Sequence, residues 1–281
     1  MNDLVKKLGK KEQRGSKPRC HWLTHGTAPD VASRLTSLVA PWAIVSPTDS
    51  WMPVGFVVTE EAQLHKATRL VDLELGKKLG EWWLPKDRTD LRTPVFDLAS
   101  TCLIDGVAGL LLIEAKAHDA ELKNESIGRK LKINKSSNRE TSEGDRPGTN
   151  SSVDENANRK ASHVTIGRAI DEACAGLGES TSEDWHISRD SHYQMSNRFA
   201  WAWKLADSGI PVVLVYLGFL RANEMSDISK PFEDAAEWEA KVRAHSAPLF
   251  SDNIWNRRWT INGAPFVPLI RSLEQPLNSQ I

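Results

Sequence analysis

A chain of 281 residues, of which 40% are hydrophobic, can bury a sizeable core in one large domain or two small ones. The formal net charge of −1 excludes a strongly basic protein that attracts nucleic acid through its overall field, so any phosphate-binding surface has to be local. The three cysteines are odd in number and lack CxxC spacing, which argues against a disulfide framework and a zinc site. No apolar run approaches the roughly 20 residues that span a bilayer, and the first residues lack the apolar stretch of a secretory signal. We therefore expect a globular, cytoplasmic protein with no membrane partner.

Residues 1–58 are expected to form a basic N-terminal arm and an irregular lead-in. Residues 1–19 carry seven Lys or Arg against two acids, which predicts a flexible, solvated arm. Apolar residues at helical spacing between Ala28 and Ala40 predict a short helix. Prolines interrupt residues 42–58, which favours short strands and turns.

Thr59 is a suitable N-cap, and the acids that follow it suit the first turn of a helix from residue 59 to about Gly80. This helix begins the predicted core of the protein, residues 59–220. The tryptophan pairs at Trp82–Trp83 and Trp201–Trp203 are expected to pack inside that core.

Residues 94–118, PVFDLASTCLIDGVAGLLLIEAKAH, contain two apolar runs around Asp105 and Gly106. An Asp-Gly pair between such runs is typical of a β-hairpin with a two-residue turn. Counting outward from that turn places Asp97 opposite Glu114, and strand alternation then puts Asp97, Glu114 and Lys116 on one face. Two opposed carboxylates repel each other unless a cation lies between them, and a divalent metal would be such a cation. A bulge at Gly109 is the alternative: it would shift the register by one residue and leave the hairpin purely structural.

Beyond the hairpin, the chain is polar from about residue 123 to 160, which predicts an insertion in the core. Apolar periodicity then predicts a helix that ends at Gly176 or Gly178, a second helix over residues 192–207 and a buried strand over residues 212–219. Residues 221–281 are expected to form a C-terminal extension packed on the core, and we identify no chemistry in it.

Several strings in this part of the chain are similar to those of one nuclease superfamily. They are Asp97 followed by a hairpin and Glu114-Ala115-Lys116, the longer string IEAKAH with Glu121 after it, and Tyr193-Gln194-x-x-Asn197-Arg198 before an apolar strand. Together they resemble an uncharacterised bacterial branch of the PD-(D/E)xK superfamily over residues 94–219. Phe96 stands where the name motif has proline.

The resemblance implies an α/β protein with a restriction-endonuclease-like α-β-β-β-α-β core, in which helices flank a mixed central sheet. It also implies Mg²⁺, or Mn²⁺ in its place, bound by Asp97, Glu114 and the backbone carbonyl of Ala115. Lys116 would orient or deprotonate a water molecule, Gln194 would position water or phosphate, and Arg198 would hold a phosphate. In this superfamily the first helix often adds an acid to the metal site; Glu74 is our candidate, and the competing acids are Glu60, Glu61 and Glu81.

The first functional hypothesis is therefore a metal-dependent nuclease that hydrolyses phosphodiester bonds, with DNA as its main partner. The alternative is a non-catalytic module that binds nucleic acid or protein on a nuclease-like fold. Titration with Mg²⁺ or Mn²⁺ separates the two, because only the first hypothesis needs Asp97 and Glu114 to bind a metal.

Overall fold

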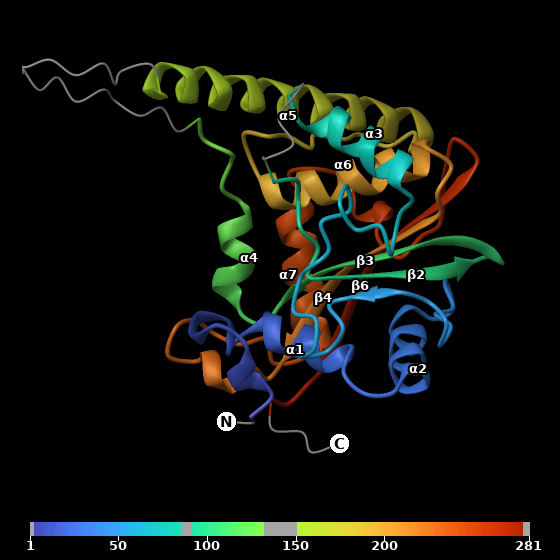
Figure 1. Ribbon diagram of the computed structural model, residues 1–281, viewed down its shortest axis with the longest axis vertical. Coiled ribbons are helices and arrows are strands. Elements are labelled where there is room, and N and C mark those ends of the chain that lie inside the picture. The colour runs from blue at the N-terminus through green and yellow to red at the C-terminus, as the bar shows by residue number, and fades with distance from the viewer. Residues whose placement is uncertain (1–2, 86–91, 132–150, 278–281) are drawn as a thin grey trace, which may run out of the picture.

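A computed structural model of the chain describes residues 3–85, 92–131 and 151–277. Its centre is a six-stranded mixed sheet in the order β1-β2-β3-β4-β6-β5, with helices on both faces (Figure 1). Strands β3, β4 and β6 are parallel, and the remaining pairings are antiparallel. The strands are β1 (Trp51–Met52), β2 (Leu98–Ile104), β3 (Val107–Lys116), β4 (Val212–Leu220), β5 (Trp259–Ile261) and β6 (Ala264–Glu274). The predicted α/β class, with a mixed sheet flanked by helices, is confirmed.

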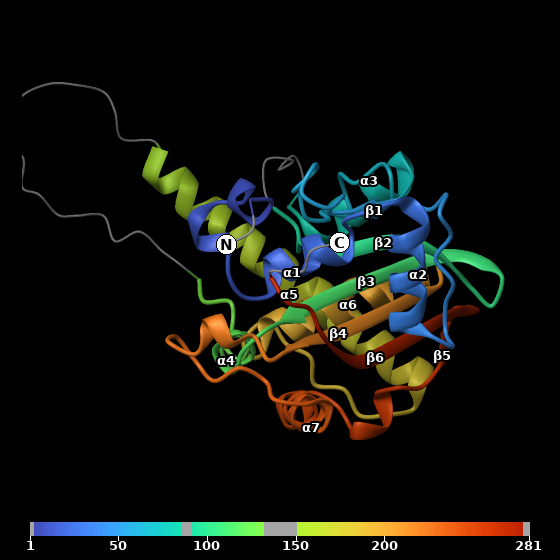
Figure 2. The same cartoon turned by 90° about the horizontal axis from the view of Figure 1, so that it is seen from below.

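The helices form one layer on each face of the sheet (Figures 1 and 2). Apolar side chains of α1 and α2 share a buried cluster with one face of β3, including Leu111 and Ile113. Side chains of α3, α5, α6 and α7 share the other cluster, which includes Leu110 and Leu112. The α-helices are α1 (Ser16–Leu23), α2 (Ala28–Val39), α3 (Leu73–Trp83), α4 (Asp119–Glu125), α5 (Ser151–Thr181), α6 (Tyr193–Asp207) and α7 (Ala235–Ser246). Short 3₁₀ turns lie at Val5–Lys7, Lys10–Glu12, Asn223–Met225 and Asp252–Ile254.

The β2–β3 hairpin has the register that the turn predicts. Ile104 pairs with Val107, and the ladder continues without a bulge to Leu98 and Ile113. Both turn residues have positive φ, 52° at Asp105 and 78° at Gly106, as a type I′ turn requires. Gly109 is not a bulge: a Cβ there would lie 2.5 Å from the carbonyl oxygen of Pro211, so the residue allows β3 to approach the chain just before β4.

The helix predicted to begin at Thr59 begins instead at Leu73, where the Asp72 side chain accepts a hydrogen bond from the Leu75 amide. The preceding segment is drawn to the sheet, because Ala62 forms a bridge with Phe96. Tertiary pairing therefore outweighs the local capping pattern at Thr59. The predicted tryptophan core is confirmed, with the rings of Trp83 and Trp201 5.7 Å apart between α3 and α6.

Helix α5 corrects two predictions. It begins at Ser151, inside the stretch predicted as a polar insertion, and continues past Gly176 and Gly178 to Thr181. Gly176 lies against the ring of Trp203, where a Cβ would be only 2.4 Å away, so close packing rather than helix termination accounts for this glycine. Residues 132–150 of the predicted insertion lie outside the described residues.

The two ends of the chain are more integrated than predicted. The expected flexible arm contains α1, and Arg19 is buried there with its guanidinium bonded to Glu224. The C-terminal segment supplies β6, which pairs with β4 over nine residues inside the sheet. Its burial explains this position, since Phe266, Val267 and Leu269 are almost completely inaccessible to solvent. No helix in the described residues is long and apolar enough to cross a membrane.

Candidate active site

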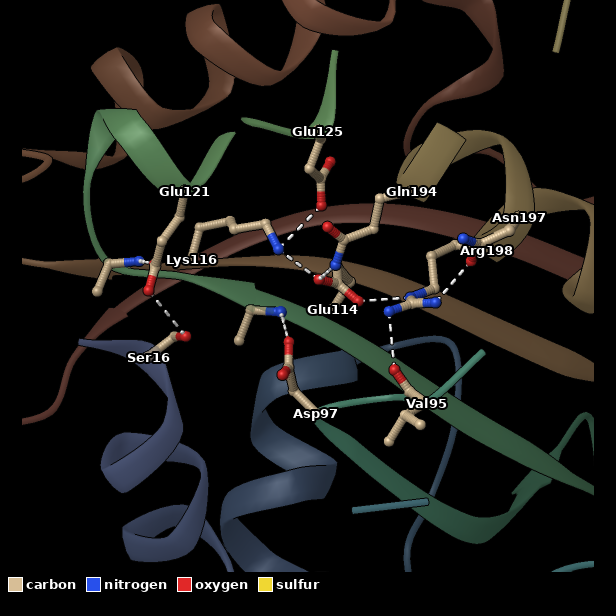
Figure 3. Close-up of polar contacts among 12 residues, drawn as sticks. Ser16, Val95, Asp97, Glu114, Lys116, Glu121, Glu125, Gln194, Asn197 and Arg198 are labelled. Atoms are coloured by element: carbon tan, nitrogen blue, oxygen red, sulfur yellow. Dashed lines mark hydrogen bonds and ion pairs between the residues drawn. The ribbon is translucent and has the colours of Figure 1, made fainter. Parts of the chain in front are cut away.

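The carboxyl end of β3 and the first two turns of α6 meet on one face of the sheet (Figure 3). Glu114 follows Leu110 and Leu112 on that face, and its carboxylate is 1% exposed. Gln194 Nε2 donates to Glu114 Oε1 at 2.5 Å, and Arg198 Nε donates to Oε2. Gln194 and Arg198 are four residues apart, so a single face of α6 presents both to the strand. The structure thus brings together three of the predicted site residues.

Lys116 lies two residues further along β3 and joins the same cluster. Its ammonium forms an ion pair with Glu114 and a second one with Glu125 Oε1 at 2.9 Å. Burial alone lowers the pKa of Lys116, but the two carboxylates outweigh burial and raise the pKa above its ordinary value. The two carboxylates therefore favour the charged form of Lys116.

Asp97 lies just before β2, in a bend outside the paired ladder. Its Oδ2 accepts a hydrogen bond from the backbone amide of Ala115 at 2.7 Å (Figure 3). The paired ladder ends at Leu98 and Ile113, one pair short of the predicted pairing of Asp97 with Glu114, and the Asp97 carboxylate turns to the backbone of β3. Burial, followed by the charge of Glu114, raises the pKa of Asp97 well above its usual range. The positive charge near Asp97 therefore does not offset the effects of burial and of Glu114 on its charged form.

The backbone of Ala115 faces the same edge of β3 as Asp97. Its amide points to Asp97, and in a strand the carbonyl of a residue points to the same side as its amide. The β2–β3 ladder has already ended at Leu98 and Ile113, so this edge lies beyond the paired part of β2. Asp97 and the Ala115 carbonyl are therefore available on the same side as potential oxygen ligands.

Arg198 is fixed more tightly than a free phosphate-binding residue would be. Besides Glu114, its guanidinium donates to the Val95 carbonyl at 2.7 Å and to the Asn197 side chain at 2.6 Å. It also lies over the ring of Phe96, 4.9 Å from the centroid. Burial lowers the pKa of Arg198, but Glu114 more than compensates and the pKa is raised. Arg198 thus acts as the fixed counter-ion of Glu114, a role that the sequence did not predict.

Glu74 does not reach this site. Its side chain is 78% exposed on α3 and forms an ion pair with Lys78. Of the competing acids, Glu61 lies near enough to Asp97 for its charge to contribute to the raised pKa of Asp97. Glu61 also pairs with Lys17 at 3.1 Å. Glu61 is thus the predicted acid whose charge reaches Asp97, and it lies in an irregular segment rather than in a helix.

Two other residues of the resembled strings have structural roles near the site. Glu121 accepts hydrogen bonds from the Ala117 amide at 2.6 Å and from Ser16 Oγ at 3.3 Å, which ties α1 to the end of β3. Tyr193 receives a hydrogen bond from Arg129 at 3.3 Å. Among the described residues, neither side chain has a hydrogen bond or ion pair with Glu114 or Lys116.

Three further buried residues surround Lys116 and Glu114 and were missed in the sequence. Glu125 ends α4, within the predicted insertion; Tyr216 lies beside Glu114 on β4; and His245 lies on α7, in the predicted extension. Of the three, only Tyr216 could have been predicted from the sequence, because the pairing of its strand with β3 places it next to Glu114. Glu125 and His245 come from segments that no local pattern connects to the hairpin.

A count of the ion pairs around the site shows which carboxylate has no counter-ion in them. Glu114 and Glu125 are balanced by Lys116 and Arg198, whereas Asp97 has no cationic partner among the ion pairs of the described residues. In that part of the chain no set of three or more acidic, His or Cys side chains is arranged to hold a metal ion. The two carboxylates and the Ala115 carbonyl are nevertheless hard oxygen donors of the kind that Mg²⁺ prefers. The donor chemistry therefore matches a divalent cation, while Glu114 is already engaged by Lys116, Gln194 and Arg198.

An assignment of function to this protein depends on the chemistry of these site residues. Comparisons of the chain with models of protein families, with curated proteins and with solved structures find no match.

Proposed function

We propose that this protein is a Mg²⁺-dependent nuclease that hydrolyses phosphodiester bonds, with DNA as its main substrate, on a restriction-endonuclease-like core. One observation carries the proposal: the Asp97 carboxylate has no ion-pair partner within residues 3–85, 92–131 and 151–277, and it lies beside the Ala115 backbone, in reach of the charges of Glu114 and the buried Lys116. A partly buried carboxylate without compensation is costly, so a site that retains one is expected to bind a cation there.

Asp97, Glu114 and the carbonyl of Ala115 would hold the metal, and Mn²⁺ could replace Mg²⁺. When bound, the metal would lower the pKa of a water molecule and neutralise charge on the scissile phosphate. Lys116, held as a cation, stabilises the negative charge that develops on the phosphate in the transition state. Gln194 would orient water or a phosphate oxygen through its side-chain amide, while Arg198 keeps Glu114 in place.

Replacement of Lys116 by Ala tests the proposal directly. We expect cleavage of plasmid and single-stranded DNA in the presence of Mg²⁺ to fall by roughly 100-fold or more, because the transition state loses a preorganised cation. Binding of Mn²⁺, measured by calorimetry, should persist because Asp97 and Glu114 remain.

Lys78→Ala is the matched control, since Lys78 is an exposed lysine on α3 that pairs with Glu74. It should cleave at the wild-type rate, and EDTA should abolish cleavage by both wild type and control. A Lys116→Ala protein that cuts DNA as fast as the wild type would refute the role of Lys116.

The second candidate function is a non-catalytic module that binds nucleic acid or protein. It is favoured by the engagement of both Glu114 oxygens, which already accept from Lys116, Gln194 and Arg198. Calorimetric titration with Mn²⁺ decides between the two: absence of binding, or binding that Asp97→Ala leaves unchanged, would support the module.

A further inference from the structure

Glu125 is a wholly buried carboxylate next to the ammonium of Lys116 (Figure 3). It is the last residue of the short helix α4, and its side chain is 0% exposed. Its Oε1 lies 2.9 Å from Lys116 Nζ, whose other carboxylate contact is Glu114. The lysine is therefore shared between two acids.

The surroundings of Glu125 come from two distant parts of the chain. His245 of α7 places Nε2 3.5 Å from Glu125 Oε2, and its side chain is 8% exposed. The ring of His192, just before α6, lies 4.8 Å from the ring of His245. Neither oxygen of Glu125 has a hydrogen bond of good geometry in the described residues. Charge, and not a set of directed hydrogen bonds, therefore holds this carboxylate beside Lys116.

Burying a carboxylate so completely costs several kcal/mol unless a cation compensates for it. Lys116 is the compensating cation, although Glu114 already has Arg198 as a counter-ion. With Glu125 present, two cations face two carboxylates on this side of the sheet. Without the negative charge of Glu125, the positive charges of Lys116 and Arg198 would both be compensated by Glu114 alone.

We propose that Glu125 is the positioning residue of Lys116: it holds the ammonium at a defined point beside Glu114 and leaves Glu114 enough negative charge to bind a metal. This inference rests on the proposed nuclease function. Glu125 does not contact the reacting atoms, so its effect passes through Lys116. His245 supports it from the side opposite the lysine contact, on the other carboxylate oxygen.

A double-mutant cycle of Glu125→Gln and Lys116→Met tests the proposal. Glu125→Gln should lower kcat by roughly 10- to 100-fold, as for other residues that orient catalytic groups, and leave KM within about twofold. It should also raise the Mg²⁺ concentration needed for half-maximal cleavage, because Glu114 is then more fully neutralised. In the Lys116→Met background the same change should cause no further loss of kcat, since the group that Glu125 positions is absent.

Glu239→Gln is the matched control, because Glu239 forms an ion pair with Arg243 on α7 and is 46% exposed. It should leave kcat and the Mg²⁺ dependence unchanged. Circular dichroism establishes that each variant is folded. If Glu125→Gln fails to fold, Glu125→Asp takes its place, and its kcat should fall below that of the wild type because its charge is one methylene further from Lys116.

Two failures can be told apart. A wild-type protein that neither binds Mn²⁺ nor cleaves DNA would overturn the nuclease proposal and this inference with it. A wild-type protein that cleaves, accompanied by a folded Glu125→Gln or Glu125→Asp variant with the same kcat and Mg²⁺ dependence, would overturn the role of Glu125 alone. Additive losses in the double-mutant cycle would also overturn it, because they would show that Glu125 does not act through Lys116.

Discussion

Replacing Asp97 by Asn is expected to stabilise the metal-free protein while abolishing its response to Mg²⁺. The Asp97 carboxylate is partly exposed, accepts one hydrogen bond from the Ala115 amide and has no cationic partner among the ion pairs of the described residues. Asparagine can keep that hydrogen bond through its side-chain oxygen. It removes the charge that burial and Glu114 disfavour.

The magnitude follows from two opposing contributions. A hydrogen bond to a charged acceptor contributes about 1.5 to 3 kcal/mol and one between neutral groups about 1, so the weaker bond costs on the order of 1 kcal/mol. Relief of a partly buried, uncompensated carboxylate gains about 2 to 3 kcal/mol, less than for a fully buried ion because Asp97 is partly solvated. The net gain is about 1 to 2 kcal/mol, which corresponds to a rise in Tm of roughly 2 to 6 °C.

Thermal unfolding in EDTA and in excess Mg²⁺ measures both effects. Mg²⁺ at 100 times its Kd should stabilise the wild type by about 2.7 kcal/mol and leave Asp97→Asn unchanged. Asp105→Asn is the matched control at the opposite end of the hairpin, where Asn also tolerates the φ of 52°. If Asp97→Asn has a lower Tm than the wild type in EDTA, the carboxylate is well compensated and the reasoning about the metal site is refuted.

Two further predictions concern stability. Arg198→Met should reduce the free energy of unfolding by about 3 to 5 kcal/mol in urea titrations, because Glu114 loses one of its two cationic partners and the Val95 carbonyl loses its buried donor. A loss below about 1 kcal/mol would show that the ion pair is dispensable, and Glu114→Gln in the same chain should recover part of the loss. Burial, aided by the charge of Lys66, lowers the pKa of His65 to about 4, so its neutral form is favoured in the folded state. The contribution of His65 to the free energy of unfolding is complete above pH 6.5. It falls as the pH drops towards 4, because His65 is protonated in the unfolded chain before it is protonated in the folded protein. After a discount for the partial exposure of His65, the loss is about 2 kcal/mol. The difference in unfolding free energy between wild type and His65→Gln, followed from pH 7 to pH 4, should shrink by that amount, and a constant difference would contradict the assignment.

The hairpin shows how much local information can determine. Asp105-Gly106 selects a two-residue turn, and the turn sets the pairing of every residue along β2 and β3. The positions of Glu114 and Lys116 on one face follow from alternation alone. The four-residue spacing of Gln194 and Arg198 likewise places both side chains on one face of α6, which is why both residues of this helix reach Glu114.

Other features depend on contacts between segments far apart in the chain. The pattern after Thr59 suits a helix, yet the pairing of Ala62 with Phe96 draws this segment along the sheet and delays the helix to Leu73. The C-terminal segment, expected to pack on the core as an extension, contributes the strand β6, which pairs with β4 inside the sheet.

The sequence by itself determined the hairpin, its register and the acids and lysine at its end, because turn chemistry and strand alternation act over a few residues. Only the tertiary structure decided how those charges are compensated. Lys116 is shared with Glu125, Glu114 is paired with Arg198, and Asp97 has no ion pair within the part of the chain that the structure describes. Electrostatic compensation depends on distance and burial in three dimensions, and Glu125 is brought to Lys116, with His245 behind it, only when α4 and α7 pack beside the sheet.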